Sequence, residues 1–119
     1  MNDNVVVNKS FSFALNTIKI YKYLSSKNEY ILSKQLLRSG TSIGANVREA
    51  IDGQSKRDFL SKMNISLKEA KETEYWIELL IESSYLNEIE HTSYLNECKE
   101  LCRILNSIVK STKASLSIG

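Results

Sequence analysis

The chain has 119 residues, of which 42% are apolar and 25% charged, with a formal net charge of +2. This length and composition fit one globular domain that buries its own core without help from a metal or disulfides. No apolar run approaches the roughly 18 residues that a membrane span needs. The first residues show no basic stretch followed by a long apolar one, as a signal peptide would. We therefore expect one cytoplasmic domain with no membrane segment.

The chain contains no proline, and this absence permits long uninterrupted helices. Apolar residues recur at spacings of three and four, which is the period of an amphipathic helix. They predict a first helix capped by Ser10, then helices over about 29–52, about 56–83 and from about residue 88. Four such helices with short connections favour antiparallel neighbours. We expect an all-α fold, an antiparallel up-down four-helix bundle over residues 10–112, with a flexible arm at 1–9 and a frayed tail at 113–119.

One apolar stripe on each predicted helix supplies the expected core. Cys98 and Cys102 fall on the stripe of the fourth helix, where we interpret them as small core residues. A metal site with His91 is the alternative, but three ligands on one helix without a fourth make a poor zinc site. The stripes are Phe13, Thr17, Ile20 and Leu24; Leu32, Leu36, Gly40, Ile43, Val47 and Ala50; Phe59, Leu60, Met63, Leu67, Ala70, Ile77, Leu80 and Ile81; and Leu95, Cys98, Leu101, Cys102, Leu105, Ile108 and Val109.

Gly40 and Gly44 lie inside the second predicted helix without breaking its period. Each interior glycine costs a helix about 1 kcal/mol relative to alanine, so two of them need a reason. Close approach of a neighbouring helix backbone is one reason, whereas a loop at 39–44 is the competing interpretation. Gly53 is expected to end this helix in a left-handed conformation, and Ser55 to cap the next helix.

A stripe of polar residues shares the second helix with these glycines. Spacings of three and four place most of its members on one face. The stripe is either a structural network buried against another helix or a solvent-facing surface, with ligand binding as a third alternative. Its members are Arg38, Ser39, Ser42, Asn46 and Glu49.

The third predicted helix carries apolar side chains on two sides. Besides its core stripe it has a second cluster, formed by Tyr75, Trp76 and Leu79. A helix that is apolar on two sides contacts more than its own bundle, and exposed aromatic surface of this kind marks interfaces. We therefore expect these three residues to form an oligomer interface in a homo-oligomer.

The small net charge hides a segregation of charge along the chain. Residues 1–28, 53–71 and 98–119 are basic, whereas residues 72–97 carry seven glutamates and no lysine or arginine. The third helix therefore begins basic and ends acidic, an order that its macrodipole disfavours. The basic end either meets nucleic-acid phosphate or meets the acidic end of another subunit, unless the order is accidental on a solvated face. The candidate nucleic-acid-binding residues are Lys19, Lys22, Lys56, Arg57 and Lys62.

Motifs that would indicate catalysis are missing from the sequence. It has no P-loop, no glycine-rich dinucleotide loop and no HExxH. The Glu-x-x-His pairs of di-iron bundles are absent, and no serine has a histidine and aspartate that would make a triad. We therefore expect a protein that is not an enzyme and that has no catalytic residue, no cofactor, no metal and no small-molecule substrate.

Two linked blocks of the sequence resemble a known family. Residues 33–50 read SKQLLRSGTSIGANVREA, residues 55–63 read SKRDFLSKM and residues 67–76 read LKEAKETEYW. These blocks are similar to those of the 23S rRNA-intervening sequence proteins, four-helix bundles encoded within bacterial large-subunit ribosomal RNA genes. The likeness covers about residues 10–110. The chain departs from many members at Gly44, where they have proline, at Ala50, where they have glycine, and by lacking tryptophan in the first helix.

The resemblance implies an up-down bundle that assembles into a homopentamer, and it favours helix rather than loop through the two glycines. A related accessory protein of diversity-generating retroelements is a basic bundle that works with nucleic acid and a reverse transcriptase. We therefore expect a non-enzymatic oligomer, a pentamer by preference, that binds RNA or a nucleoprotein. The alternative is a protein-interaction scaffold that binds no nucleic acid.

Overall fold

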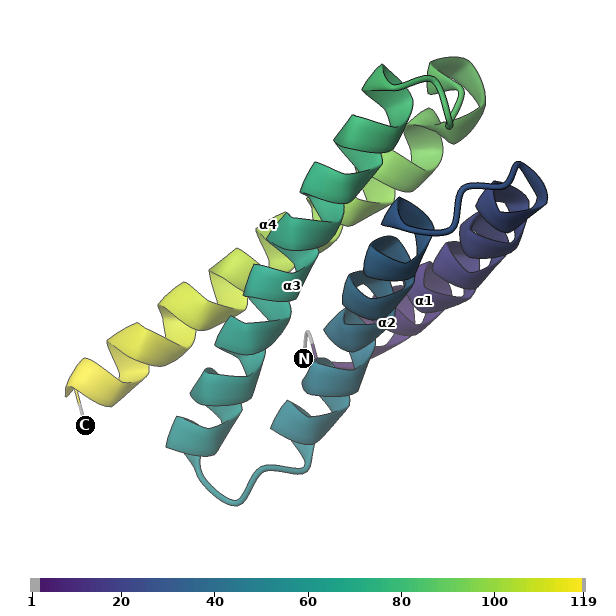
Figure 1. Ribbon diagram of the computed structural model, residues 1–119. Coiled ribbons are helices and arrows are strands. Elements are labelled where there is room, and N and C mark those ends of the chain that lie inside the picture. The colour runs from purple at the N-terminus through teal and green to yellow at the C-terminus, as the bar shows by residue number, and fades with distance from the viewer. Residues whose placement is uncertain (1–2, 119) are drawn as a thin grey trace.

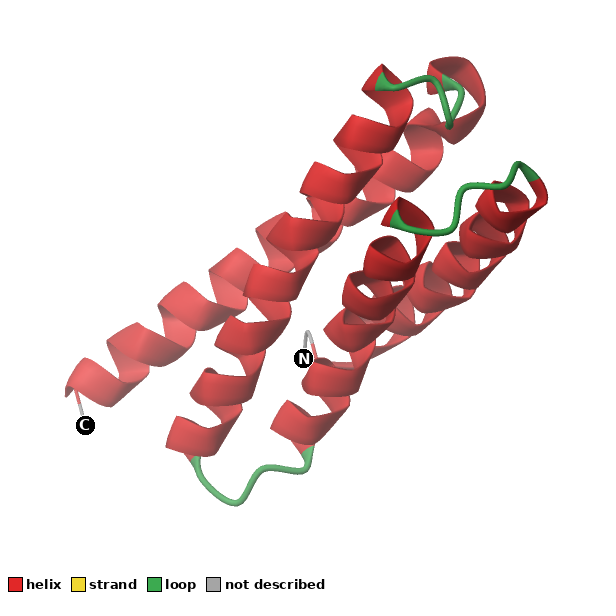
Figure 2. Cartoon of the chain, viewed as in Figure 1, coloured by secondary structure: helices red, strands yellow, loops and turns green. Residues whose placement is uncertain are grey.

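The structure, a computed structural model, describes residues 3–118, and in this range it consists of four α-helices without strands (Figures 1 and 2). The helices are α1 (Asp3–Ser26), α2 (Leu32–Ile51), α3 (Lys56–Glu82) and α4 (Glu88–Ile118). They form an elongated body that measures 51 × 21 × 20 Å. The predicted all-α four-helix fold is confirmed.

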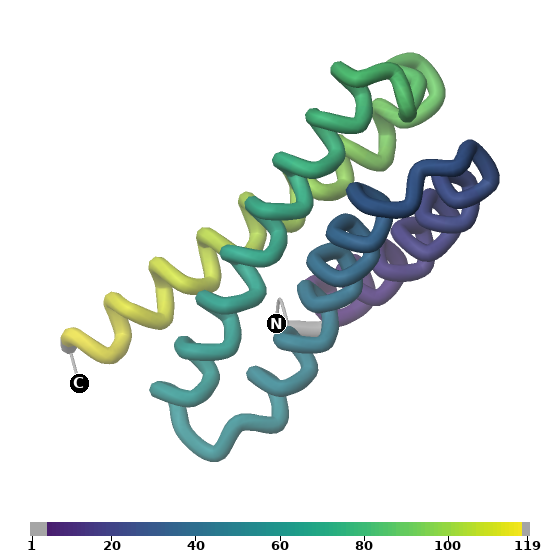
Figure 3. Tube along the Cα trace, viewed as in Figure 1, coloured from purple at the N-terminus to yellow at the C-terminus, as the bar shows by residue number. Residues whose placement is uncertain are grey.

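Pairs of residues on neighbouring helices fix the direction of each helix. Thr17 of α1 lies against Gly40 of α2, and Ser10 lies against Gly44, so the two helices are antiparallel. On the other side of the bundle, the Cys98 thiol of α4 contacts the Ala70 carbonyl of α3 at 3.3 Å. Figure 3 shows the resulting up-down path: the α1–α2 and α3–α4 turns lie at one end and the α2–α3 turn at the other.

The core is formed by the predicted stripes. Thr17, Gly40 and Ala70 are buried with them, as the close packing of helices requires. Among the largest fully buried side chains are Phe13, Leu24, Leu36, Ile43, Met63, Ile77, Leu80, Leu101 and Leu105. None of the helices within the described range contains an apolar stretch long enough to cross a bilayer.

The predicted arm over residues 1–9 is wrong for the part of it that the structure describes, because α1 begins at Asp3. Val6 is fully buried, and the Ser10 hydroxyl donates to the Val7 carbonyl at 3.2 Å, so Ser10 lies within the helix and does not cap it. The register explains the extension. Ser10 packs against Gly44, and α2 continues to Ile51, so its last turns need α1 residues before Ser10 to cover them. Residues 1 and 2 lie outside the described range.

The predicted frayed tail at 113–119 is also helical as far as Ile118. Lys56, the first residue of α3, donates to the Ser115 hydroxyl at 2.6 Å. Because α3 begins at that end of the bundle, α4 must reach the same level to cover it. Residue 119 lies outside the described range.

The remaining helix ends agree in part with the sequence. The Ser55 hydroxyl accepts from the Asp58 amide at 3.1 Å, which confirms the predicted cap of α3. The left-handed conformation predicted for Gly53 is wrong, because no described glycine has a positive φ. Space is limited at Gly53 instead: a Cβ there would stand 3.0 Å from the Ala50 carbonyl oxygen, a tight contact.

The start of α2 depends on a side chain that the sequence placed inside the helix. The Glu29 carboxylate accepts hydrogen bonds from the amides of Ile31, Leu32 and Ser33, at 3.2, 3.0 and 2.6 Å. These amides would otherwise lack partners at the helix start. The helix therefore begins at Leu32, and Glu29 caps it.

Candidate functional site

The antiparallel packing of α3 and α4 brings two basic segments to one end of the bundle. Residues 53–71 contain five basic and two acidic residues, and residues 98–119 contain four basic and one acidic residue. They lie far apart in the sequence, but the hydrogen bond from Lys56 to Ser115 joins the first turn of α3 to the last turns of α4. We call this part of the molecule the basic end and define it by Lys56, Arg57, Lys110 and Lys113. All four residues are exposed.

A groove opens beside Lys56 at this end, with a volume of about 410 Å³. Hydroxyl groups and one lysine can donate to a phosphate oxygen, so the groove has the chemistry of a backbone-contacting surface. Its lining residues include Ser55, Lys56, Phe59, Ser111, Thr112 and Ser115.

The five basic residues predicted to bind nucleic acid do not form one surface. Lys56 and Arg57 belong to the basic end, but Lys62 makes an ion pair with Glu49 at 3.0 Å. Lys19 and Lys22 lie in the second half of α1, toward the α1–α2 turn at the opposite end of the bundle. Sequence reasoning missed Lys110 and Lys113, which only the pairing of α4 with α3 brings to the same end of the bundle as Lys56.

The polar stripe of α2 faces α3 and connects the two helices. Arg38 pairs with Glu69 at 3.2 Å and also with Glu72, and the Thr73 hydroxyl donates to Ser39 at 2.8 Å. Ser42 and Asn46 bond backbone carbonyls of their own helix, and Glu49 pairs with Lys62. Among the described residues, no buried side-chain nitrogen or oxygen lacks a hydrogen-bond partner. Three members of the stripe, Arg38, Ser39 and Glu49, therefore bond side chains of α3, and Ser39 is the buried one.

The three residues predicted to form an oligomer interface are in different environments. Tyr75 is 55% exposed, and Leu79 is half-buried. Trp76 packs against the core, and its Nε1 donates to Glu72 at 2.9 Å. Tyr75 and Leu79 therefore remain available for contacts outside the bundle, whereas Trp76 mainly serves the fold.

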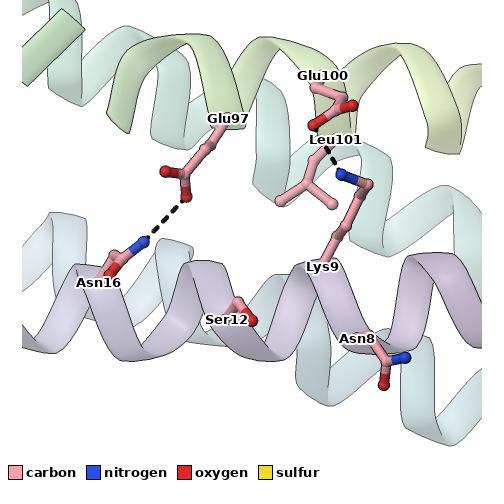
Figure 4. Close-up of a pocket in the computed structure, with 7 residues that line it drawn as sticks. All are labelled: Asn8, Lys9, Ser12, Asn16, Glu97, Glu100 and Leu101. Carbon is pink, nitrogen blue, oxygen red and sulfur yellow. Dashed lines mark hydrogen bonds and ion pairs between the residues drawn. The ribbon is translucent and has the colours of Figure 1, made fainter. Parts of the chain in front are cut away.

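A polar groove separates α1 from α4, which contact each other less extensively than the other neighbouring helices do (Figure 4). The groove has a volume of about 350 Å³. Asn16 donates to Glu97 at 3.0 Å, and Lys9 pairs with Glu100 at 3.2 Å, so each carboxylate already has a partner on α1. The groove is a polar seam between helices. Its lining residues are Asn8, Lys9, Ser12, Asn16, Glu97, Glu100 and Leu101.

The cysteines and the histidine do not combine into a metal centre. Cys98 is fully buried, and a hydrogen bond with Cys102 together with burial raises the pKa of its thiol. The His91 ring lies against Tyr23 with 5.6 Å between the ring centroids, at the start of α4. Within the described residues, no group of three or more histidine, cysteine, aspartate or glutamate side chains is placed to hold a metal ion.

One surface was missed by sequence reasoning. Phe11, Leu15 and Ile18 on α1 are 50%, 49% and 37% exposed, although their spacing places them beside the core stripe. The sequence does indicate this surface, because the apolar residues of α1 lie on more than one face of the helix, as those of α3 do.

Comparisons with known proteins place this bundle in a family. The family model described as 23S rRNA-intervening sequence protein matches residues 2–107. A crystal structure of a protein with unknown function from the S23 ribosomal protein family of Bacteroides thetaiotaomicron is similar, with 51% identity and a TM-score of 0.89. The similarity covers 92% of this chain and 99% of that one. No match was found among curated proteins. The chain therefore belongs to the family of 23S rRNA-intervening sequence proteins.

Proposed function

We propose that this chain is a non-enzymatic, oligomeric protein that binds RNA through its basic end. The observation that carries the proposal is the meeting of two basic segments at the start of α3 and the end of α4. Exposed lysine and arginine side chains neutralise phosphates and release their counterions, which is the main source of affinity without sequence specificity. The hydroxyl groups of the adjoining groove add donors for phosphate and sugar oxygens.

The charge distribution of the bundle supports this choice of surface. Residues 72–97, which carry seven glutamates, occupy the other end of the α3–α4 pair. That end repels a phosphate backbone, so RNA would meet the basic end in a defined orientation. The family's name refers to an intervening sequence of 23S rRNA and is consistent with a role in that setting.

Binding to a stem-loop RNA, measured by fluorescence anisotropy over a series of NaCl concentrations, tests the proposal. The wild-type protein should bind at low salt, and its affinity should fall steeply as salt rises. The variant in which Lys56, Arg57, Lys110 and Lys113 are all changed to alanine should bind more weakly. The slope of the logarithm of its binding constant against the logarithm of salt concentration should shrink in magnitude by about one unit for each phosphate that the variant no longer neutralises.

The matched control changes two lysines at the opposite end, Lys27→Ala and Lys34→Ala, and is compared with Lys56→Ala and Arg57→Ala. Both double variants remove two exposed positive charges, so they change the net charge equally. If equal losses of affinity followed, binding would depend on net charge alone and the basic end would not be the site. Absence of binding at low salt would overturn the RNA proposal itself.

A protein-interaction scaffold is the second candidate, and the exposed apolar residues of α1 favour it. Phe11 and Leu15 are each about half exposed, which is unusual for large apolar side chains that serve only one bundle. A partner that remains bound after nuclease treatment would support this function. A partner that is released by nuclease would support RNA binding.

A further inference from the structure

An apolar groove runs between α1 and α2 on the surface of the bundle. Phe11, Leu15 and Ile18 form its α1 wall, and Gly44 and Ala45 belong to its α2 side. Its volume is about 340 Å³. The three α1 residues recur at spacings of four and three, so they form one continuous strip of half-exposed apolar side chains along one face of the helix.

The close approach of α1 and α2 gives the groove its shape. A Cβ added at Gly44 would stand 3.3 Å from the Ser10 carbonyl oxygen, so the two backbones nearly touch here. The floor therefore consists of small residues such as Ala14 and Thr41, while the long side chains rise along one edge. A groove of this form accepts a large apolar side chain from another molecule.

The surroundings of the groove are basic. Arg48 lines it, and its guanidinium carbon lies 5.2 Å from the centroid of the Phe11 ring. Lys19 and Lys22 follow Leu15 and Ile18 by one helical turn. Residues 5–26 contain no acidic residue. The best-matched occupant is therefore an apolar segment with acidic neighbours.

The chain itself carries such a segment on α3. Tyr75 is 55% exposed and Leu79 is half-buried. Glu72 precedes Tyr75 by three residues and Glu82 follows Leu79 by three, so both glutamates flank this pair on the same face of the helix. Glu78 is the neighbour of Leu79 in the sequence. The α3 helix contacts α2 and α4 but not α1. One copy therefore cannot place its α3 stripe in its own α1–α2 groove, and only a second copy can bring the two surfaces together.

We propose that the α1–α2 groove of one copy receives the Tyr75 and Leu79 side chains of the next copy. Glu78 and Glu82 of the incoming α3 then lie near Arg48 and Lys22 of the receiving copy. The proposal rests on the oligomer proposed above and adds the identity of its two contact surfaces. Because these surfaces differ, the contact is head-to-tail, and copies continue until a ring closes or a filament forms.

Disulfide trapping between two variants that each carry one introduced, exposed cysteine tests the direction of this contact. Leu15→Cys and Tyr75→Cys are each made together with Cys102→Ser, which leaves the buried Cys98 as the remaining natural thiol. Under mild oxidation, the mixture of the two proteins should give a cross-linked dimer. Either protein alone should give far less of this dimer. Ile89→Cys, at a side chain 90% exposed and outside both surfaces, replaces Leu15→Cys as the control and should not cross-link to Tyr75→Cys.

Two results would overturn the proposed contact. A Leu15→Cys protein that cross-links to itself as readily as to Tyr75→Cys would indicate an interface of like with like. A mixture that gives no more cross-linking than the Ile89→Cys control would show that the surfaces do not meet.

Light scattering coupled to size exclusion separates failure of this contact from failure of assembly. The wild-type protein should exceed the chain mass of 13.6 kDa, Leu15→Glu should fall to that mass, and Ile89→Glu should behave as wild type. Circular dichroism should report the same helix content for both variants, since each replaced side chain is exposed. A monomeric wild type would overturn both assembly and this contact, whereas an assembled Leu15→Glu protein would overturn the contact alone.

Discussion

At the scale of single residues, the cap of α2 has a measurable dependence on pH. Burial acts to raise the pKa of Glu29, but hydrogen bonds from the Leu32, Ser33 and Ile31 amides outweigh it and leave the pKa below its ordinary value of 4.5. A carboxylate whose pKa is lowered by folding stabilises the folded state above the ordinary pKa. That stabilisation is lost as the pH falls through the lowered value.

We therefore predict that Glu29→Ala reduces the free energy of unfolding by about 1 kcal/mol at pH 7, as loss of a helix cap does. The difference from wild type should shrink below pH 4.5. Urea unfolding at pH 7 and in acid measures both values. Glu49→Ala, which removes an exposed partner of Lys62, is the control and should change stability by less than about 0.5 kcal/mol. A Glu29→Ala difference that persists unchanged in acid would contradict the charged cap.

The contact between Thr17 and Tyr94 is a second residue-scale feature, because it joins α1 to α4 inside the core. The two hydroxyl oxygens lie 2.7 Å apart, and the Tyr94 ring stacks on Phe13 with 4.8 Å between centroids. Burial raises the pKa of Tyr94, so its hydroxyl stays protonated well above neutral pH.

Tyr94→Phe should keep the stacked rings and lose only this hydrogen bond. We expect a loss of about 1 kcal/mol in the free energy of unfolding. Chemical denaturation measures it, and Tyr85→Phe, at an exposed tyrosine in the α3–α4 turn, is the control. Equal stability of Tyr94→Phe and wild type would mean that the hydroxyl pair adds nothing to the α1–α4 contact.

At the scale of helices, the two glycines of α2 set its distance from α1. A Cβ at Gly40 would stand 2.7 Å from the Thr17 side chain, whereas a Cβ at Gly44 would stand 3.3 Å from the Ser10 carbonyl oxygen. Thr17 is fully buried and bonds both Tyr94 and the Phe13 carbonyl, so its side chain has little freedom to move.

The two glycines should therefore respond differently to alanine. Replacing glycine by alanine inside a helix ordinarily stabilises it by about 1 kcal/mol. At Gly40 we expect a net loss, because overpacking costs about 1–3 kcal/mol. At Gly44 we expect a change near zero, because a small shift relieves the contact. Thermal unfolding of both variants makes the comparison, and leucine at either position should destabilise more than alanine. If Gly40→Ala were more stable than wild type, the close approach of α1 to α2 would not be what requires glycine at this position.

The helices were predictable from the sequence wherever a helix's own apolar core stripe determines that the segment is helical. Phe13, Leu36, Met63 and Leu101 each belong to the core stripe of a different helix, and all are buried as predicted. The extra turns at both chain ends were not predictable in this way. Val6 lies in a segment without strong helix formers, and its helix is stabilised by packing against a neighbour whose register the sequence does not state.

The candidate site was less predictable than the fold. The basic character of residues 53–71 was visible, but the partner of that segment depends on which helix lies beside it. Lys110 and Lys113 reach the same end of the bundle as Lys56 only because α4 runs antiparallel to α3 and extends to its first turn. Lys19 and Lys22 have the same charge and lie elsewhere. Charge along a sequence therefore indicates the kind of partner, whereas the fold determines the surface.

At the scale of the whole molecule, the resemblance to the family makes the number of copies a specific prediction. Light scattering should give a mass five times the chain mass of 13.6 kDa if the head-to-tail contact closes as a pentamer. A closed ring should keep this mass over a range of protein concentrations, because every contact surface is occupied. A mass that grows steadily with concentration would indicate an open filament, and a stable dimer would contradict a head-to-tail contact.

Salt should separate the two proposed properties of the molecule. Raising NaCl from 0.1 M to 1 M shortens the Debye length from about 10 Å to about 3 Å, which screens exposed charges. RNA binding at the basic end depends on such charges, so it should be lost over this range. The proposed contact between copies depends mainly on burial of the α1 strip and of Tyr75, and salt does not weaken that burial. We therefore expect the oligomer mass in 1 M NaCl to equal the mass in 0.1 M NaCl, while the anisotropy signal of bound RNA disappears. Dissociation of the oligomer in step with the RNA would mean that the pairing of Glu78 and Glu82 with Arg48 and Lys22, and not the apolar strip, holds the copies together.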